Sequence, residues 1–269
     1  RVVASDSESW PVGTLCQVND WGLGETHWGG LSQLLAVPAE WISPVPEGRG
    51  AKWAASLGTA GFTAALCVMA LLDHGLKVED GPVLVTGVTG GVGSVATLLL
   101  SQMGFEVVGS TGSIDATGEA ENDNVQRHLS KLGLSSSSLV HRDSLSRPGK
   151  PLQGTHYAAV VDSIGSHTLA NALAQTRYGG IVAACGLAQG MDLDASVAPF
   201  ILRSVTLRGI NCVYRSAEDR ARAWGLLADA FADRETDWMI QVIHLSEALG
   251  YSRDLLANQI QGRVVVNCV

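Results

Sequence analysis

The sequence predicts an α/β protein built around a doubly wound parallel sheet. Three observations carry this prediction. Short apolar runs such as Val83-Leu-Val85 are typical of strands that are buried on both faces. Helical patterns alternate with these runs through the middle of the chain, as the crossovers of a parallel sheet require. A chain of 269 residues that is 46% hydrophobic is also large enough to bury such a sheet.

Charge, cysteine usage and hydropathy exclude several classes of protein. The net charge of −8 argues against a nucleic-acid-binding surface, because no Lys/Arg cluster offsets it. No unbroken apolar run reaches the roughly 18 residues of a membrane helix, so we expect no membrane partner. The cysteines show no C-x-x-C pair and no metal-binding spacing, which favours reduced thiols in a cytoplasmic protein. They are Cys16, Cys67, Cys185, Cys212 and Cys268.

In chain order, the elements begin with a β-rich segment. We expect short strands at 13–18 and 31–37, separated by a glycine-rich loop, and the segment is too small to enclose a core alone. The pattern of residues 51–75 predicts a helix, which Gly58 and Gly61 divide into two pieces.

The rest of the chain alternates between strands and helices. Residues 114–124 are acidic and polar, as is typical of a solvated loop. In a sheet of this kind the ligand crevice lies at the carboxyl ends of the strands. We expect strands at 83–87, 105–109, 158–162, 180–186, 205–210 and 262–267, and helices at 92–103, 125–132, 167–176, 216–231 and 246–257.

The stretch from Val85 to Ser94 has the pattern of a dinucleotide-binding fingerprint. Four glycines follow an expected strand and precede an expected helix. Gly87 permits the tight turn, and Gly93 lets the helix lie close to the strand. Gly90 and Gly91 let a pyrophosphate approach the N–H groups at the helix start. The spacing is G-x-x-G-G-x-G and not the strict G-x-G-x-x-G, so a glycine-rich turn that binds nothing is the alternative.

Six motifs, in the same order over nearly the whole chain, resemble one family. They are Gly24-Glu-Thr-His-Trp-Gly-Gly30, Gly58-Thr-Ala-Gly-Phe-Thr63, Val85-Thr-Gly-Val-Thr-Gly-Gly-Val-Gly-Ser94, Ala183-Ala-Cys-Gly-Leu187, Pro199-Phe-Ile-Leu-Arg203 and Asn258-Gln-Ile-Gln-Gly-Arg263. The set is similar to the zinc-free acryloyl-CoA reductase branch of the medium-chain dehydrogenase/reductases, also described as quinone-oxidoreductase-like.

The resemblance implies a fold and an assembly. A Rossmann dinucleotide-binding domain would span 51–232. A partial GroES-like β domain, the catalytic domain, would be formed by both termini, at 1–50 and in the C-terminal return at 233–269. The resemblance also implies a homodimer. The family's opening β segment, with its Asn-Tyr-Lys-Asp stretch, has no counterpart in this sequence, so we expect a chain that lacks this part.

The resemblance further implies single cofactor contacts. The pyrophosphate loop is matched by Thr89, Gly90, Gly91 and Val92, and the adenosine-phosphate end by Thr111, Gly112 and Ser113. Positions near the nicotinamide half are matched by Leu187, Ile201 and Cys212, and Asn258 would reach the cofactor from the C-terminal strand region. Cys212 stands where the family often has Ser, so we expect it to contact the cofactor through its backbone. For Leu187 and Ile201, plain core packing is the alternative.

The tip of the second strand predicts the cofactor. NAD-binding versions carry a carboxylate there, which holds the ribose hydroxyls. Here Ser110–Ser113 is uncharged and tolerates a 2′-phosphate, which favours NADPH. The family usually has Arg or Lys at the position of Ser113, so Arg127 or Arg142 would have to supply the charge. The alternative for each arginine is a solvated surface position.

These expectations lead to an NADPH-dependent oxidoreductase that reduces the carbon–carbon double bond of a small enoyl-CoA such as acryloyl-CoA. A quinone reductase of the same fold and a truncated, inactive dinucleotide-binding protein are the alternatives. The sequence assigns no catalytic residue. His27 and Glu25 could relay a proton, but a histidine in such a loop is more often structural. Cys16, His27 and Glu25 do not form a zinc ligand set, so we expect no metal.

Overall fold

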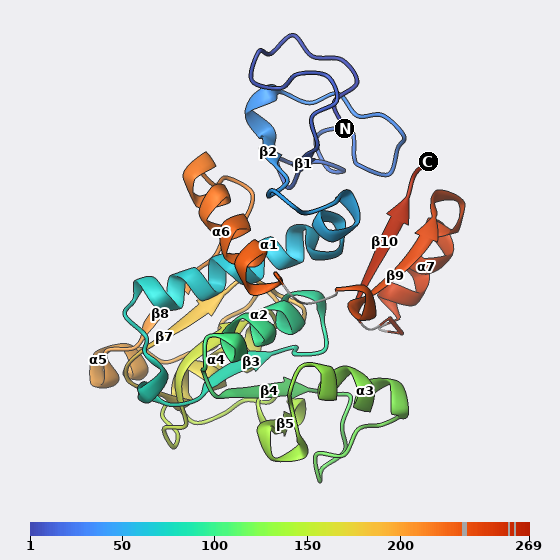
Figure 1. Cartoon of the computed structure of the whole chain (residues 1–269). Helices are drawn as coiled ribbons and strands as arrows, with labels where there is room; N and C mark the ends of the chain where they lie inside the picture. The colour runs from blue at the N-terminus through green and yellow to red at the C-terminus, as the bar shows by residue number, and fades with distance from the viewer. Residues whose placement is uncertain (233–235, 258, 261) are drawn as a thin grey trace. The chain divides into compact units, whose positions relative to one another are not determined.

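The computed structural model describes residues 1–232, 236–257, 259–260 and 262–269 (Figure 1). By its contacts the chain divides into two compact units. The first unit consists of residues 1–62 and 211–269, and the second of residues 63–210. These bounds differ from the domain bounds expected at 50/51 and 232/233, which stay a prediction.

The second unit is built on a six-stranded sheet with the strand order β5-β4-β3-β6-β7-β8. Every neighbouring pair is parallel. The order runs outward in both directions from β3, which is the doubly wound arrangement, so the predicted fold class is confirmed. The strands are β3 (Val83–Thr86), β4 (Val107–Thr111), β5 (Leu139–His141), β6 (Tyr157–Asp162), β7 (Thr176–Ala184) and β8 (Thr206–Gly209).

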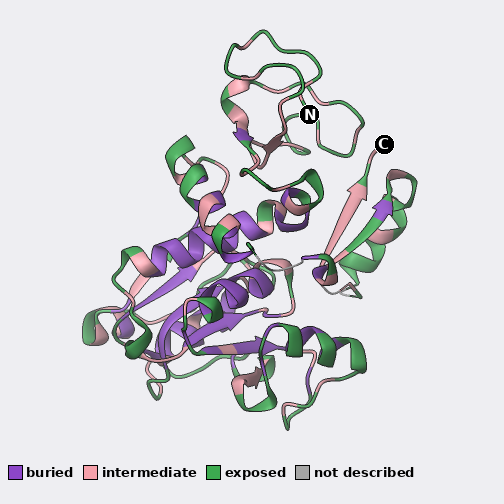
Figure 2. Ribbon diagram, in the orientation of Figure 1, coloured by how far each residue is buried: buried purple, intermediate pink, exposed green. Residues whose placement is uncertain are grey.

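Helices of the second unit pack on this sheet. Helix α2 contacts β3 and β4, and α4 contacts β6 and β7. The apolar run Val83-Leu-Val85 is fully buried, as a strand covered on both faces requires, and Figure 2 shows the buried residues concentrated along these strands. The helices are α2 (Gly91–Gln102), α3 (Asp123–Lys131), α4 (Ser166–Gln175) and α5 (Ala198–Arg203).

The described residues of the first unit form two small sheets, the beginning of α1 (Ala51–Asp73) and two further helices. Strand β1 (Cys16–Val18) pairs antiparallel with β2 (Ile42–Pro44). Strand β9 (Ile240–His244) pairs parallel with β10 (Arg263–Asn267). The helices are α6 (Ala217–Ala230) and α7 (Ala248–Leu256). Short 3-10 helices occur in both units, at Ala39–Trp41, Val78–Asp80, Ser136–Ser138, Arg142–Ser144, Asp237–Met239 and Leu245–Glu247.

Helix α1 (Ala51–Asp73) crosses the boundary between the units and is broken where the sequence predicts. Gly58 has φ 48° and ψ −153°, which interrupts the helix, so two helical pieces are confirmed. Gly61 makes no second break. Within the described residues, α1 is the one helix long and apolar enough to cross a membrane. Because 72% of that apolar stretch is buried inside the structure, it is a core helix.

Two sequence predictions about local structure differ from the result. Residues 31–37 form no strand; instead Ser32 Oγ donates to Leu34 O at 2.8 Å, and Leu31 and Leu34 are 63% and 72% exposed. An alternating pattern alone does not make a strand when no partner strand lies beside it. Strands β2, β5 and β9 and helix α5 were not predicted, because each is short and carries little periodicity.

Candidate functional site

The glycine-rich loop joins β3 to α2 at the carboxyl edge of the sheet. Gly87 has φ 63°, and the N–H of Gly90 donates to Gly87 O at 2.9 Å, which closes the turn. A Cβ on Gly93 would lie 2.3 Å from Gly87 O, so the helix can approach the loop only with glycine at 93. Gly90 is the N-cap of α2 and no side chain caps the helix there. The loop is therefore a close-packed turn that presents the helix start to an anion.

The tip of β4 lies beside this loop. Thr89 Oγ1 is 3.3 Å from Thr111 Oγ1, and the N–H of Val88 donates to Ser110 O at 3.1 Å. The N–H of Ser113 donates to Thr111 Oγ1 at 3.1 Å, which fixes the hydroxyl at the strand end. The structure thus brings together the two groups of residues expected at the pyrophosphate and at the adenosine-phosphate end.

The structure separates the two candidate arginines. Arg142 follows β5, and the pairing of Thr111 with His141 places residue 142 next to Gly112. A Cβ on Gly112 would lie 2.5 Å from Arg142 Nε, so the guanidinium group lies directly against the backbone of the tip. Arg127 instead donates to Asn124 Oδ1 and to the carbonyl oxygen of Asp123 within its own helix. The basic group at the strand tip is therefore Arg142.

Asp115, the first acidic residue after the tip in the sequence, forms hydrogen bonds within its own turn. Asp115 Oδ1 accepts from the Thr117 hydroxyl at 2.7 Å and from the N–H of Glu119 at 3.0 Å. These hydrogen bonds lower the pKa of the Asp115 carboxyl, the bond from the Thr117 side chain being the largest cause. The Asp115 carboxylate therefore holds its own turn together.

A second polar cluster, which the sequence did not predict, lies where β3 and β6 end. Asp162 is fully buried; its Oδ1 accepts from Thr86 Oγ1 at 2.7 Å, and its Oδ2 from the N–H of Gly165 at 2.9 Å. Burial raises the pKa of Asp162, and these hydrogen bonds oppose the rise. The cluster fixes the backbone at the crevice edge. An aspartate that ends an apolar strand run is the signal that could have indicated it.

The first unit contains a cavity of about 540 Å³ around the loop that carries His27. Its lining is Gly24, Glu25, Thr26, His27, Trp28, Gly29, Ala36, Pro38 and Trp41. His27 Nδ1 lies 3.0 Å from Thr26 Oγ1, and the imidazole meets the Trp41 ring edge-on at 4.6 Å. The imidazole and the Glu25 carboxyl are both exposed at this cavity. The arrangement is compatible with proton transfer but does not by itself assign it.

The remaining expected cofactor residues fall in different parts of the structure. Leu187 and Ile201 are 57% and 72% exposed, so the core-packing alternative is wrong for both. Cys212 belongs to the first unit, where its Sγ donates to Asp20 Oδ1 at 3.3 Å. Asn258 lies outside the described residues. In the part of the chain that the structure describes, no three His, Cys, Asp or Glu side chains form a metal-binding group. The metal-free expectation stays a prediction.

Comparisons with known proteins agree on one family. A family model described as zinc-binding dehydrogenase matches residues 91–229. Acrylyl-CoA reductase AcuI from Ruegeria pomeroyi is 43% identical over 264 residues, which cover 98% of this chain and 77% of the relative. The crystal structure of YhdH from Escherichia coli K-12 with bound NADPH has a TM-score of 0.91 and 40% identity, covering 98% of this chain and 78% of that one.

A third relative differs from these two in its assigned name and in the cofactor bound in its crystal structure. It is a Bacillus subtilis protein named "Putative quinone oxidoreductase YhfP", 38% identical over 269 residues, which cover 98% of this chain and 78% of the relative. The crystal structure of YhfP has NAD bound and a TM-score of 0.90. The similar structures therefore include one with NADPH and one with NAD.

Proposed function

The chain belongs to the medium-chain dehydrogenase/reductase family, and we propose that it is an NADPH-dependent oxidoreductase that reduces the carbon–carbon double bond of a small enoyl-CoA such as acryloyl-CoA. The identity of 43% to an acrylyl-CoA reductase supports the substrate class. The observation that carries the cofactor choice is Arg142, which lies across Gly112 at a strand tip without a carboxylate.

The residues at the sheet edge fit a dinucleotide with a 2′-phosphate. A Cβ on Gly93 would overlap the loop backbone, and one on Gly90 would lie only 3.2 Å from Gly87 O. The uncapped start of α2 offers N–H groups to a pyrophosphate. The Thr111 hydroxyl and the Arg142 guanidinium would meet the adenosine phosphate. When bound, NADPH supplies the hydride that adds to the β-carbon of the acceptor.

The chain's own contribution is to hold and orient the reactants. Reduction of an enoyl thioester places negative charge on the thioester oxygen, which hydrogen-bond donors must stabilise, and the α-carbon then takes up a proton. His27 and Glu25, at the cavity of the first unit, are the titratable groups that we propose as candidates for that proton transfer. No step requires a metal ion, because donors can stabilise the enolate directly.

The cofactor proposal is tested with one variant and one matched control. Arg142→Gln removes the charge at the tip, and Arg127→Gln removes a charge that the structure ties to its own helix. We expect Arg142→Gln to weaken NADPH binding by about 1–2 kcal/mol, roughly tenfold, since a charge-assisted contact to phosphate is lost. NADH binding should not change, and Arg127→Gln should change neither. Equal loss for both cofactors would show that Arg142 does not contact the 2′-phosphate.

The reaction proposal is tested by following NADPH oxidation with acryloyl-CoA as the acceptor. A quinone reductase is the second candidate, favoured by the relative named as a quinone oxidoreductase, so duroquinone is assayed in parallel. Oxidation with duroquinone alone would select that alternative. NADPH binding without turnover of either acceptor would indicate an inactive dinucleotide-binding protein.

We further propose a cytoplasmic homodimer. Strand β8 is an edge strand of the six-stranded sheet, so its outer side is available for pairing with a second copy. Sedimentation of the purified protein at micromolar concentration should give twice the mass of 28.2 kDa. A monomer at that concentration would contradict the proposal.

A further inference from the structure

The first unit buries a charged pair that the proposed reaction does not use. Asp20 follows β1, Arg220 lies in α6, and both side chains are only 4% exposed. Arg220 Nη1 is 4.0 Å from Asp20 Oδ2, which is too long for a hydrogen bond. Burial raises the pKa of Asp20 and lowers that of Arg220. Because burying two charges is costly, such a pair persists only where further contacts compensate it.

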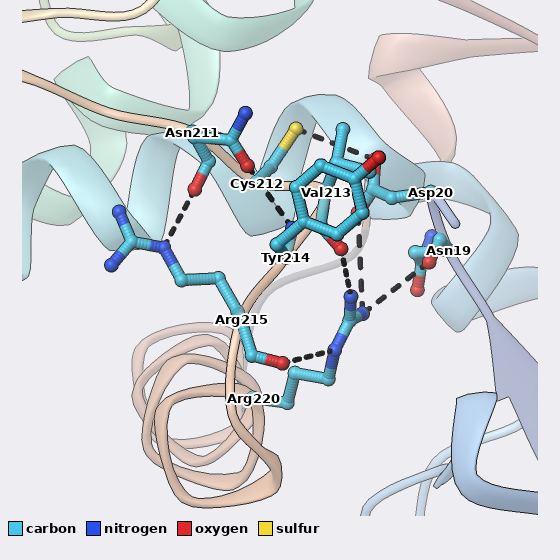
Figure 3. Close-up of polar contacts among 8 residues, drawn as sticks. All are labelled: Asn19, Asp20, Asn211, Cys212, Val213, Tyr214, Arg215 and Arg220. Atoms are coloured by element: carbon cyan, nitrogen blue, oxygen red, sulfur yellow. Dashed lines mark hydrogen bonds and ion pairs between the residues drawn. The ribbon is translucent and has the colours of Figure 1, made fainter. Parts of the chain in front are cut away.

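Those contacts come from backbone carbonyl groups of two distant segments. Arg220 Nε donates to Arg215 O at 3.3 Å and Nη2 to Val213 O at 3.0 Å, and Nη1 donates to Asn19 O at 3.3 Å (Figure 3). Asn19 and Arg220 are 201 positions apart in the sequence. One guanidinium group therefore fastens the segment 211–215 to the loop that follows β1.

Asp20 completes the connection through Cys212. The Cys212 thiol donates to Asp20 Oδ1 at 3.3 Å, and Thr59 also hydrogen-bonds to the Asp20 carboxyl. Within 211–215, the N–H of Tyr214 donates to Asn211 Oδ1 at 3.0 Å, which closes a turn around Cys212 (Figure 3). The conformation of this segment is thus fixed from one side by the Asp20–Arg220 pair.

The same guanidinium group also supports the loop around His27. It lies over the Trp21 ring at 4.7 Å and over the Phe62 ring at 5.2 Å. Trp21 stacks on Trp41 with a centroid distance of 5.7 Å, and Trp41 meets the His27 imidazole at 4.6 Å. A continuous row of rings therefore leads from the buried Arg220 to the cavity.

The backbone of this loop is strained in a way that requires such support. Asp20 has φ 70° and Trp21 has φ 56°, which places two successive residues with side chains in the left-handed region. Strain of this kind persists where surrounding contacts hold it. Here the carboxylate of Asp20 and the ring of Trp21 are both held by Arg220.

We propose that Arg220 is a positioning residue that holds the segment 211–215 and the His27 loop in one fixed arrangement. This inference rests on the proposed function in one respect, since Cys212 is one of the residues expected near the nicotinamide half. Because its side chain is buried, we assign Arg220 no contact with substrate or cofactor. It acts through the backbone of 211–215 and through the row of rings.

The test compares Arg220→Lys with Arg253→Lys, whose side chain is exposed on α7. A lysine keeps the charge, but its three donors lie on one nitrogen and it has no planar group to lie over the two rings. Iodoacetamide labelling, measured by mass spectrometry for each cysteine, should be at least fivefold faster at Cys212 in Arg220→Lys. Labelling at Cys16 and Cys268 should not change. With NADPH and acryloyl-CoA, kcat should fall at least tenfold, while the Kd for NADPH changes less than threefold.

Several outcomes would overturn the inference. Unchanged labelling and kcat in a folded Arg220→Lys variant would show that Arg220 does not position 211–215. If that variant does not fold, Asp20→Asn is measured instead; it keeps an acceptor for the thiol but removes the charge, and it should lower kcat with little change in Kd. An Asp20→Asn variant with wild-type kcat would also refute the inference. Failure of the proposed function is distinguishable, since it would appear as absent NADPH oxidation in the wild type.

Discussion

Replacement of Gly93 by alanine tests the glycine loop directly. The added Cβ would lie 2.3 Å from Gly87 O and 2.7 Å from Val88 Cα, and ordinary contact begins at 3.4 Å. Both atoms belong to the backbone, so no side chain can turn aside to make room. Helix α2 and the loop must move apart by about 1.1 Å. This displacement would change the surface that the helix start presents to a pyrophosphate.

The expected magnitudes follow from this overlap. Overpacking of this kind costs about 1–3 kcal/mol, and the better helix propensity of alanine returns less than about 1 kcal/mol. We expect a net loss of about 1–2 kcal/mol, which lowers Tm by roughly 2–8 °C for a chain of this size. Because the phosphate-binding backbone moves by about 1 Å, the Kd for NADPH should rise at least tenfold.

The matched control is Gly225→Ala in α6. A Cβ there would meet no atom within 4 Å, so only the gain in helix propensity remains. This variant should gain about 0.5–1 kcal/mol and bind NADPH like the wild type. Thermal unfolding followed by circular dichroism gives Tm, and quenching of intrinsic fluorescence gives Kd. A Gly93→Ala variant with wild-type Tm and Kd would refute the reasoning.

Three further predictions concern cofactor choice, pH and metal. Thr111→Asp places a carboxylate at the strand tip and should narrow or reverse the preference for NADPH over NADH; a wild type that already prefers NADH would contradict it. Burial lowers the pKa of His128 below 6.5, so the unfolded chain binds the proton more readily. The free energy of unfolding should therefore fall as pH drops below 6.5, with this group contributing at most about 1.4 kcal/mol per pH unit. In His128→Asn it should fall less steeply. If denaturant titrations give the same pH dependence for the wild type and His128→Asn, this prediction is wrong. Exhaustive chelation should leave enoyl-CoA reduction intact, with no stoichiometric zinc by elemental analysis; chelator-sensitive alcohol oxidation would show the opposite.

The Rossmann sheet could be predicted from the sequence because its strands are buried on both faces. The run Val83-Leu-Val85 and the glycines after it leave few alternatives, and the structure has β3, the turn and α2 at nearly the predicted positions. In the first unit the strands are three to five residues long and only partly buried, so they lack the continuous apolar run that marks a strand covered on both faces. The mistaken strand at 31–37 reflects this difference, since its apolar residues have no partner strand in the described chain.

The choice between Arg127 and Arg142 shows why part of the site required the structure. Both arginines follow the strand tip at a distance that a loop could span, so the sequence leaves them equivalent. The register of β5 on β4 separates them, because His141 pairs with Thr111 and the next residues, Arg142 and Gly112, become neighbours. The three residues of β5 are too few for a periodic signal. The strand that positions the Arg142 charge therefore could not be predicted from the sequence.

The buried Asp20–Arg220 pair could not be predicted from the sequence for a different reason. An aspartate after a short strand is normally interpreted as a solvent-exposed turn residue, and an arginine in an amphipathic helix as part of its outer face. Their burial follows only from where the loop after β1 meets α6, with Trp21 and Phe62 covering the guanidinium group. An apolar residue in place of Arg220 would leave three carbonyl groups unpaired, and a lysine lacks the planar fork whose three nitrogens each donate to one of them. The cost of this cluster is therefore consistent with a requirement for one fixed geometry at 211–215, which a hydrophobic core alone would not impose.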